Sequence, residues 1–219
     1  MMKKTALAAA IGGAALLCSM AAPAMAEKSA GDILARARIV LVQPDESSKL
    51  SLGNTAIPGH VALDSSIIPE LDFSYFFTDN IAAELILGTT QHHPKAQATP
   101  LGASVDLGDV WLLPPTLTLQ YHFNPKGTVS PYVGAGINYT IFYGEDPGAA
   151  LDTKYDNGFG YALQAGVDFA LTEKWSFNVD VKKLWLNTNV KVNAGLPSLI
   201  KADVDIDPWL IGVGFGYRF

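Results

Sequence analysis

The chain has 219 residues, of which 49% are hydrophobic and 16% are charged, whereas about 25% are charged in a typical soluble domain. This composition excludes a disordered chain, which would be polar and highly charged. The formal net charge of −6 argues against a nucleic-acid partner, because no basic excess is available to neutralise phosphates. With one cysteine, the chain cannot form a disulfide framework or a cysteine-rich metal module.

The N-terminal segment predicts export from the cytoplasm. Lys3 and Lys4 precede an apolar stretch that is too short and too rich in alanine to anchor the chain in a membrane. The run Ala24-Met25-Ala26 has the small-x-small pattern that a signal peptidase reads. We therefore expect residues 1–26 to be a signal peptide and residues 27–219 to form the mature protein.

The mature chain alternates between apolar and polar side chains, which is the period of a β-strand. In the last segment Trp209, Ile211 and Val213 alternate with Gly212 and Gly214. No stretch of 18 apolar residues predicts a transmembrane helix, but each alternating segment is about as long as a tilted strand that crosses a bilayer. The expected strands are 33–42, 67–77, 81–89, 113–123, 130–141, 158–170, 175–187 and 206–219.

Short and long connections follow one another along this series of strands. The short ones are 78–80, 124–129 and 171–174, and the long ones are 43–66, 90–112, 142–157 and 188–205. Outer-membrane barrels place short turns in the periplasm and long loops outside the cell. The predicted fold is therefore all-β, an eight-stranded antiparallel transmembrane β-barrel with four long extracellular loops and three short periplasmic turns. Such a chain is a multi-pass protein of the bacterial outer membrane.

A soluble β-sandwich or a lipocalin-like barrel would also alternate, but with its apolar side chains inside. Here the apolar faces carry aromatic residues near the strand ends, such as Phe77, Trp175 and Trp209. The opposite faces are charged, and the interior of an eight-stranded barrel is just filled by side chains. We therefore expect the charges to pair inside the barrel and to block a wide water pore, in preference to ion conduction. The predicted plug comprises Arg36, Arg38, Glu70, Asp72, Glu84, Asp168, Asp180, Lys182 and Arg218.

Prolines near the outer ends of two strands predict a lateral opening. Proline has no N–H group and cannot donate to a strand ladder. Pro114, Pro115 and Pro208 can therefore each interrupt pairing close to the outer rim of the barrel.

Several motifs occur in order along residues 27–219, and together they resemble the OmpW family of outer-membrane proteins. The resemblance implies an eight-stranded barrel with a narrow, partly hydrophobic channel for small, largely hydrophobic molecules. It also implies that some members serve as bacteriocin receptors. The motifs are Thr78-Asp79-Asn80-Ile81 followed by Glu84-Leu85, Leu113-Pro114-Pro115-Thr116-Leu117, Pro131-Tyr132-Val133-Gly134-Ala135-Gly136-Ile137-Asn138-Tyr139-Thr140, Asp207-Pro208-Trp209 and Gly216-Tyr217-Arg218-Phe219.

Two classes of function follow from these patterns. The first is a porin-like channel for passive uptake of small hydrophobic molecules, with a lateral exit into the membrane. By the resemblance, Ile86, Leu184, Leu186 and Leu210 line its apolar chamber. The second is a structural barrel whose loops act as a receptor or binding surface, for a bacteriocin or another partner. In either case the expected partners include outer-membrane lipids.

The C-terminal residues Tyr217 and Phe219 resemble the signal that the barrel-assembly machinery reads during biogenesis. This machinery is therefore a further expected partner.

The sequence predicts no enzyme, cofactor or metal site, and an acyl-transfer barrel of the same strand count is a distant alternative. His92 and His93 are expected in a solvated loop, because adjacent residues on an extended chain point apart. Asp203, Asp205 and Asp207 share one face of a strand. They lack the glycine and glutamate spacing of an EF-hand.

Overall fold

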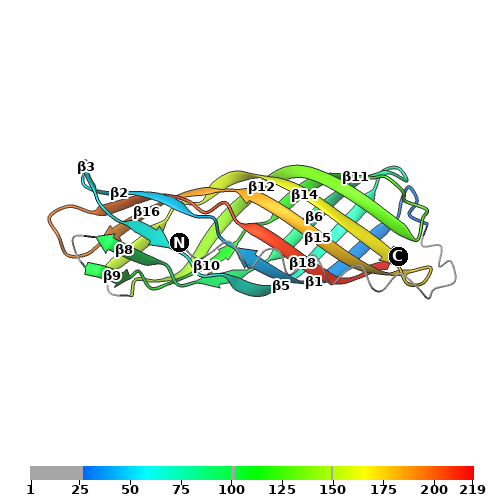
Figure 1. Cartoon of the computed structure of the whole chain (residues 1–219). Helices are drawn as coiled ribbons and strands as arrows, with labels where there is room; N and C mark the ends of the chain where they lie inside the picture. The colour runs from blue at the N-terminus through cyan, green and yellow to red at the C-terminus, as the bar shows by residue number, and fades with distance from the viewer. Residues whose placement is uncertain (1–26, 100–101, 149) are drawn as a thin grey trace.

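The computed structural model describes residues 27–99, 102–148 and 150–219, so the predicted signal peptide lies outside the described residues. Among those residues, no helix is long and apolar enough to span a membrane. The prediction of eight barrel strands is confirmed (Figure 1). They are β1 (Ile33–Gln43), β5 (Ser66–Phe76), β6 (Ile81–Gly88), β11 (Thr116–His122), β12 (Val129–Asp146), β14 (Gly158–Ala170), β15 (Trp175–Trp185) and β18 (Trp209–Arg218).

The eight strands form a closed antiparallel barrel. Around the barrel the order is β11, β6, β5, β1, β18, β15, β14 and β12, and β12 pairs again with β11. The first and last strands meet, with Ala37 opposite Phe215. Closure leaves no strand edge facing lipid, which is required because hydrocarbon offers no partner for backbone N–H and C=O groups.

The alternation is inverted relative to a soluble protein, as predicted. Outward side chains such as Val133 and Leu163 are apolar and exposed, whereas inward side chains such as Asp72 and Glu84 are charged and fully buried. At the periplasmic end, Tyr217 packs edge-on against Trp175, with 5.0 Å between ring centroids. These aromatic rings belong to the interfacial girdle of an outer-membrane barrel.

The predicted long loops contain more strand than the sequence pattern indicates. Two smaller sheets extend beyond the barrel, with orders β13-β16-β17-β2-β3 and β4-β8-β9, and β7 and β10 prolong β6 and β11 (Figure 1). These strands are short, at three to seven residues each, so no long alternating run reveals them. They are β2 (Ser47–Leu52), β3 (Thr55–Ile57), β4 (His60–Ala62), β7 (Thr90–His92), β8 (Lys95–Thr99), β9 (Gly102–Asp106), β10 (Asp109–Leu113), β13 (Asp152–Tyr155), β16 (Asn187–Asn193) and β17 (Ile200–Asp205).

Phe219 leads to a first prediction. Its ring is exposed on the lipid side 4.9 Å from the ring of Tyr217, and its N–H donates to the Ile33 carbonyl. The backbone bond survives substitution, so we expect Phe219→Ala to act on assembly and to lower the amount of folded barrel in the outer membrane. Immunoblots of unheated and boiled membrane samples measure that amount. Ile33→Ala, on the neighbouring strand, is the matched lipid-facing control. Unchanged levels of folded Phe219→Ala barrel would contradict the assembly role.

Candidate functional site

A layer of paired charges crosses the middle of the barrel. Arg36 on β1 lies at its centre and contacts three carboxylates from three other strands. Its Nη1 atom lies 2.9 Å from Asp72 and 3.2 Å from Glu84, and its Nη2 atom lies 3.0 Å from Asp168. All four side chains are almost completely buried.

Arg38 extends the layer one step toward the outside. Its guanidinium lies 2.8 Å from Glu70 and 2.6 Å from Asp72. Lys182 on β15 bridges Glu70 at 2.9 Å and Asp180 at 2.7 Å. Because these contacts join β1, β5 and β15 across the lumen, the ion-pair network closes the barrel at this level.

Lys28 also enters this network, although it precedes the first strand and no periodic pattern marks it. Its ammonium group lies 2.6 Å from Asp168, donates to Ser130 at 2.9 Å and lies 3.1 Å from the His122 ring nitrogen. By contrast, Arg218 is not part of the plug to which the alternation assigned it. Its guanidinium pairs with Asp32 at 3.0 Å near the periplasmic end, where it remains partly exposed.

Above the plug, toward the outside, lies a largely apolar cavity of about 50 Å³. Ile86, Leu184, Leu186 and Leu210 are buried and line it. Glu70 and Lys182, which belong to the plug, also contribute to the lining. The cavity therefore ends against the charged layer. A water molecule needs a cavity volume of about 10–15 Å³, so this cavity has room for only a few waters.

The strand ladder is interrupted beside this cavity. Ile86 pairs with Thr116, and farther up Thr90 pairs with Leu112 in the same register. Between these two pairs, residues 87–89 and 113–115 are all described, and no ladder pair joins them. We call this interruption the seam.

Pro114 explains the seam. The neighbouring Pro115 carbonyl accepts the Tyr139 N–H of β12 at 3.2 Å, so the backbone of Pro114 is directed the other way, toward β6. There Pro114 has no N–H to donate. Its carbonyl accepts the Thr116 hydroxyl at 2.9 Å instead of a bond from the facing strand. Both hydrogen-bonding capacities toward β6 are thus lost at one residue.

The opening predicted at Pro208 is absent from the described structure. The Pro208 carbonyl accepts the Leu184 N–H at 3.1 Å, and the Asp207 carboxylate accepts the Leu186 N–H at 3.0 Å. Asp207 has a φ of 37° and forms the corner between β17 and β18. The Pro208 carbonyl and the Asp207 carboxylate thus both accept N–H groups of β15, and the β15–β18 edge stays bonded.

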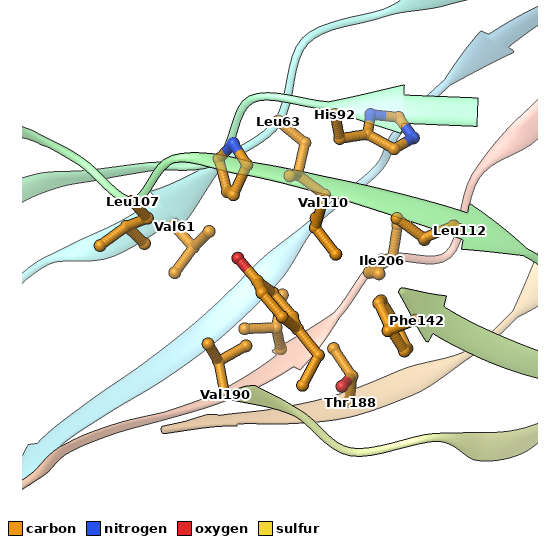
Figure 2. A pocket seen from close by; sticks show the side chains of 13 residues that line it. Val61, Leu63, His92, Leu107, Val110, Leu112, Phe142, Thr188, Val190 and Ile206 are labelled. Carbon is orange, nitrogen blue, oxygen red and sulfur yellow. The ribbon is translucent and has the colours of Figure 1, made fainter. Parts of the chain in front are cut away.

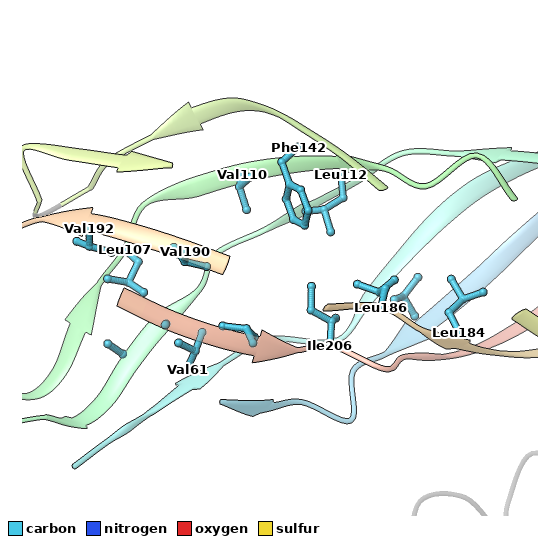
Figure 3. Packing of buried hydrophobic residues seen from close by; sticks show 14 of the residues in the cluster. Val61, Leu107, Val110, Leu112, Phe142, Leu184, Leu186, Val190, Val192 and Ile206 are labelled. Atoms are coloured by element: carbon cyan, nitrogen blue, oxygen red, sulfur yellow. The ribbon is translucent and has the colours of Figure 1, made fainter. Parts of the chain in front are cut away.

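A second cavity of about 20 Å³ lies farther out, between the barrel extensions and the outer sheets. Figure 2 shows its apolar side chains, among them Val61, Leu107 and Phe142, converging on one space. They belong to a continuous apolar cluster that reaches Leu184 at the level of the inner cavity (Figure 3). An apolar interior therefore extends from the outer strands down to the plug.

His92 lies between the two cavities and corrects an expectation. The sequence suggested a solvated loop, but His92 is on β7, is buried, and has its Nε2 atom 3.4 Å from the Thr90 hydroxyl. The adjacent His93 lies just past the end of β7, is exposed and contacts Asp109. With Leu112 and Ile206, His92 lines both cavities. These three residues therefore mark the boundary between the cavities.

The three aspartates near the end of the chain form no convergent site. Asn187 donates to Asp203 at 2.6 Å and to Asp205 at 2.9 Å, whereas Asp207 serves the backbone of Leu186. Within 27–99, 102–148 and 150–219, no group of three or more candidate ligands gathers for a metal ion.

The OmpW family model matches residues 29–219. The uncharacterized outer-membrane protein y4mB of Sinorhizobium fredii is 51% identical over 166 residues, covering 74% of this chain and 71% of that protein. The dibenzothiophene metabolism operon protein PahQ of Pseudomonas aeruginosa is 31% identical over 208 residues, covering 93% of this chain and 95% of that protein. The crystal structure of OprG from Pseudomonas aeruginosa superposes with a TM-score of 0.84 at 32% identity, covering 89% of this chain and 99% of that chain. The chain therefore belongs to the OmpW family and is a multi-pass β-barrel of the bacterial outer membrane.

Proposed function

We propose that this barrel is a channel for passive uptake of small hydrophobic molecules across the outer membrane. A solute enters between the outer strands, reaches the cavity beside Ile86 and leaves sideways through the seam. One observation carries this proposal: a buried, mostly apolar cavity adjoins both the charged plug and the one break in the β6–β11 ladder, among the described residues. The plug opposes a straight path to the periplasm.

The chemistry of the cavity favours apolar solutes over sugars. Burying an apolar solute is favourable by about 0.8 kcal/mol per CH₂ group. A sugar hydroxyl placed among Ile86, Leu184 and Leu210 would lose its hydrogen bonds to water, at a cost of roughly 1–3 kcal/mol for each group left unpaired. The walls of the cavity thus select against hydrophilic molecules.

The cavity is smaller than such a solute, so transport requires the seam to widen. At a normal ladder, separation would expose N–H and C=O groups to lipid, at several kcal/mol each. At the seam Pro114 has no N–H, and its carbonyl is already bound by Thr116. The β6–β11 edge therefore costs less to open at the seam than a fully bonded stretch of ladder would.

The relatives add support of a limited kind. PahQ is named for an operon of dibenzothiophene metabolism, and dibenzothiophene is an apolar aromatic compound. Uptake of molecules of that class fits the cavity of this chain.

Placing a charge in the cavity tests the function. Ile86→Arg should reduce naphthalene uptake by cells to near the level of cells without the protein, because an apolar solute cannot displace a buried guanidinium. Ile86→Leu keeps the volume and apolar character and should retain uptake. Unheated and boiled gel samples verify equal amounts of folded barrel. Normal uptake by Ile86→Arg, or sugar passage as fast as that of naphthalene, would contradict the channel and favour a structural or receptor role.

A further inference from the structure

We propose that the inner face of β12, together with β13, recognises the polar group of amphipathic solutes, small apolar molecules that carry one hydrogen-bonding group. The recognising groups are the Tyr155 hydroxyl, the Thr140 hydroxyl and the Asn138 side-chain amide, which we call the polar track. This inference rests on the proposed uptake function and narrows its class of solutes.

The polar track consists of groups that lack hydrogen-bond partners in an apolar interior. The Tyr155 hydroxyl, the Thr140 Oγ1 atom and both amide atoms of Asn138 are buried without a partner among the described residues. Leaving such groups unpaired costs about 1–3 kcal/mol each, and most buried polar groups in proteins are satisfied. Several unpaired groups along one wall thus form an unusual and costly feature.

These groups follow one another along the inner wall, from the outer cavity toward the level of the inner one. Tyr155 lines the outer cavity, and its ring stacks on Phe142 of β12 with 5.4 Å between centroids. Thr140 and Asn138 lie two and four residues farther down β12, on the same inward face. Asn138 pairs in register with Thr116, which lines the inner cavity. The track therefore connects the levels of the two cavities.

The rest of the interior matches the apolar body of such a solute. Besides Tyr155, the outer cavity lining includes Val61, Leu107 and Val190, whose apolar side chains point into the same space (Figure 2). Burial raises the pKa of Tyr155, with a smaller contribution from Glu145, so the phenol stays protonated and can donate. Threonine and asparagine can donate or accept. A hydroxyl or carbonyl on the solute can therefore pair with each group in turn.

At about 20 Å³ the outer cavity is too small for an organic molecule in the structure described. Its lining comes from separate elements, including β4, β10, β16 and β17, which belong to three different sheets. Binding therefore requires the three sheets to move apart while the strand ladder within each sheet stays intact.

The test compares toluene with p-cresol, which differ by one hydroxyl. Dissociation constants are measured calorimetrically with the purified barrel in lipid nanodiscs, with empty nanodiscs as background. Tyr155→Phe and Thr140→Val should each weaken p-cresol binding about five-fold, the effect of one net hydrogen bond, and leave toluene binding unchanged. Tyr161→Phe removes the same atom from an exposed tyrosine on the lipid side and should change neither constant.

Three outcomes would overturn the inference. If p-cresol binds both track variants as it binds the native barrel, the groups are hydrated and recognise nothing. If the variants weaken the binding of toluene and p-cresol equally, the residues act only in packing. If Tyr161→Phe reproduces the effect, the site is not the track. Failure of the uptake function is a separate result, in which the native barrel neither binds nor transports toluene.

Discussion

Replacing Arg36 with alanine is expected to lower the free energy of unfolding by about 3–5 kcal/mol, the usual effect of removing one partner from a buried ion pair. The substitution would leave Asp72, Glu84 and Asp168 facing one another in a space from which water is excluded. Their mutual repulsion and lost hydrogen bonds both act against the folded barrel. Urea titration in phospholipid vesicles, monitored by tryptophan fluorescence and gel mobility, measures the change.

Arg218→Ala is the matched control for this prediction. Arg218 also pairs with a carboxylate, Asp32 at 3.0 Å, but the pair is partly exposed at the periplasmic end. Such pairs contribute about 0–1 kcal/mol, so the control should remain close to the native stability. Equal losses for Arg36→Ala and Arg218→Ala would show that the central layer is not a stabilising plug.

The alternating pattern was enough to place the barrel strands, because a lipid-facing strand must keep one apolar face over its whole length. The alternation along each strand also indicated that Arg36 and Glu70 point inward. It could not indicate which charge meets which, since that depends on the register between strands. Lys28 was not predicted, because it enters the lumen from a segment in which apolar and polar side chains do not alternate.

The two proline sites show why the seam could not be located from residue type alone. Pro114 and Pro208 lack the same N–H group, yet the ladder is interrupted beside Pro114 and continuous beside Pro208. The difference lies in the neighbours. Thr116 binds the Pro114 carbonyl, whereas the Asp207 side chain supplies an acceptor next to Pro208. Similarly, His92 is buried because it lies on β7, a strand of three residues that is too short for an alternating pattern to reveal.

The second large effect is expected when the seam is closed covalently. The unchanged register between Ile86–Thr116 and Thr90–Leu112 places Thr89 opposite Leu113. Directly opposite positions on antiparallel strands lie about 4.5–5.5 Å apart, within disulfide range. Residues 27–219 contain no cysteine, so Thr89→Cys with Leu113→Cys gives a single possible bridge within these residues. Oxidation should therefore lock β6 against β11 without filling the cavity.

A control bridge isolates the effect of the seam. Leu85 and Leu117 are register partners on the same pair of strands, and both face lipid. Leu85→Cys with Leu117→Cys adds a bridge where the ladder is already bonded, so oxidation there should leave uptake unchanged. Non-reducing gels verify that each bridge has formed.

Naphthalene uptake by cells carrying the Thr89–Leu113 cysteine pair, measured before and after reduction, tests the lateral route most directly. We predict that cells with the oxidised barrel take up naphthalene no faster than cells without the protein. A reductant should restore uptake in the same sample. Equal uptake by the oxidised and reduced forms, with the bridge shown to be complete, would contradict passage through the seam.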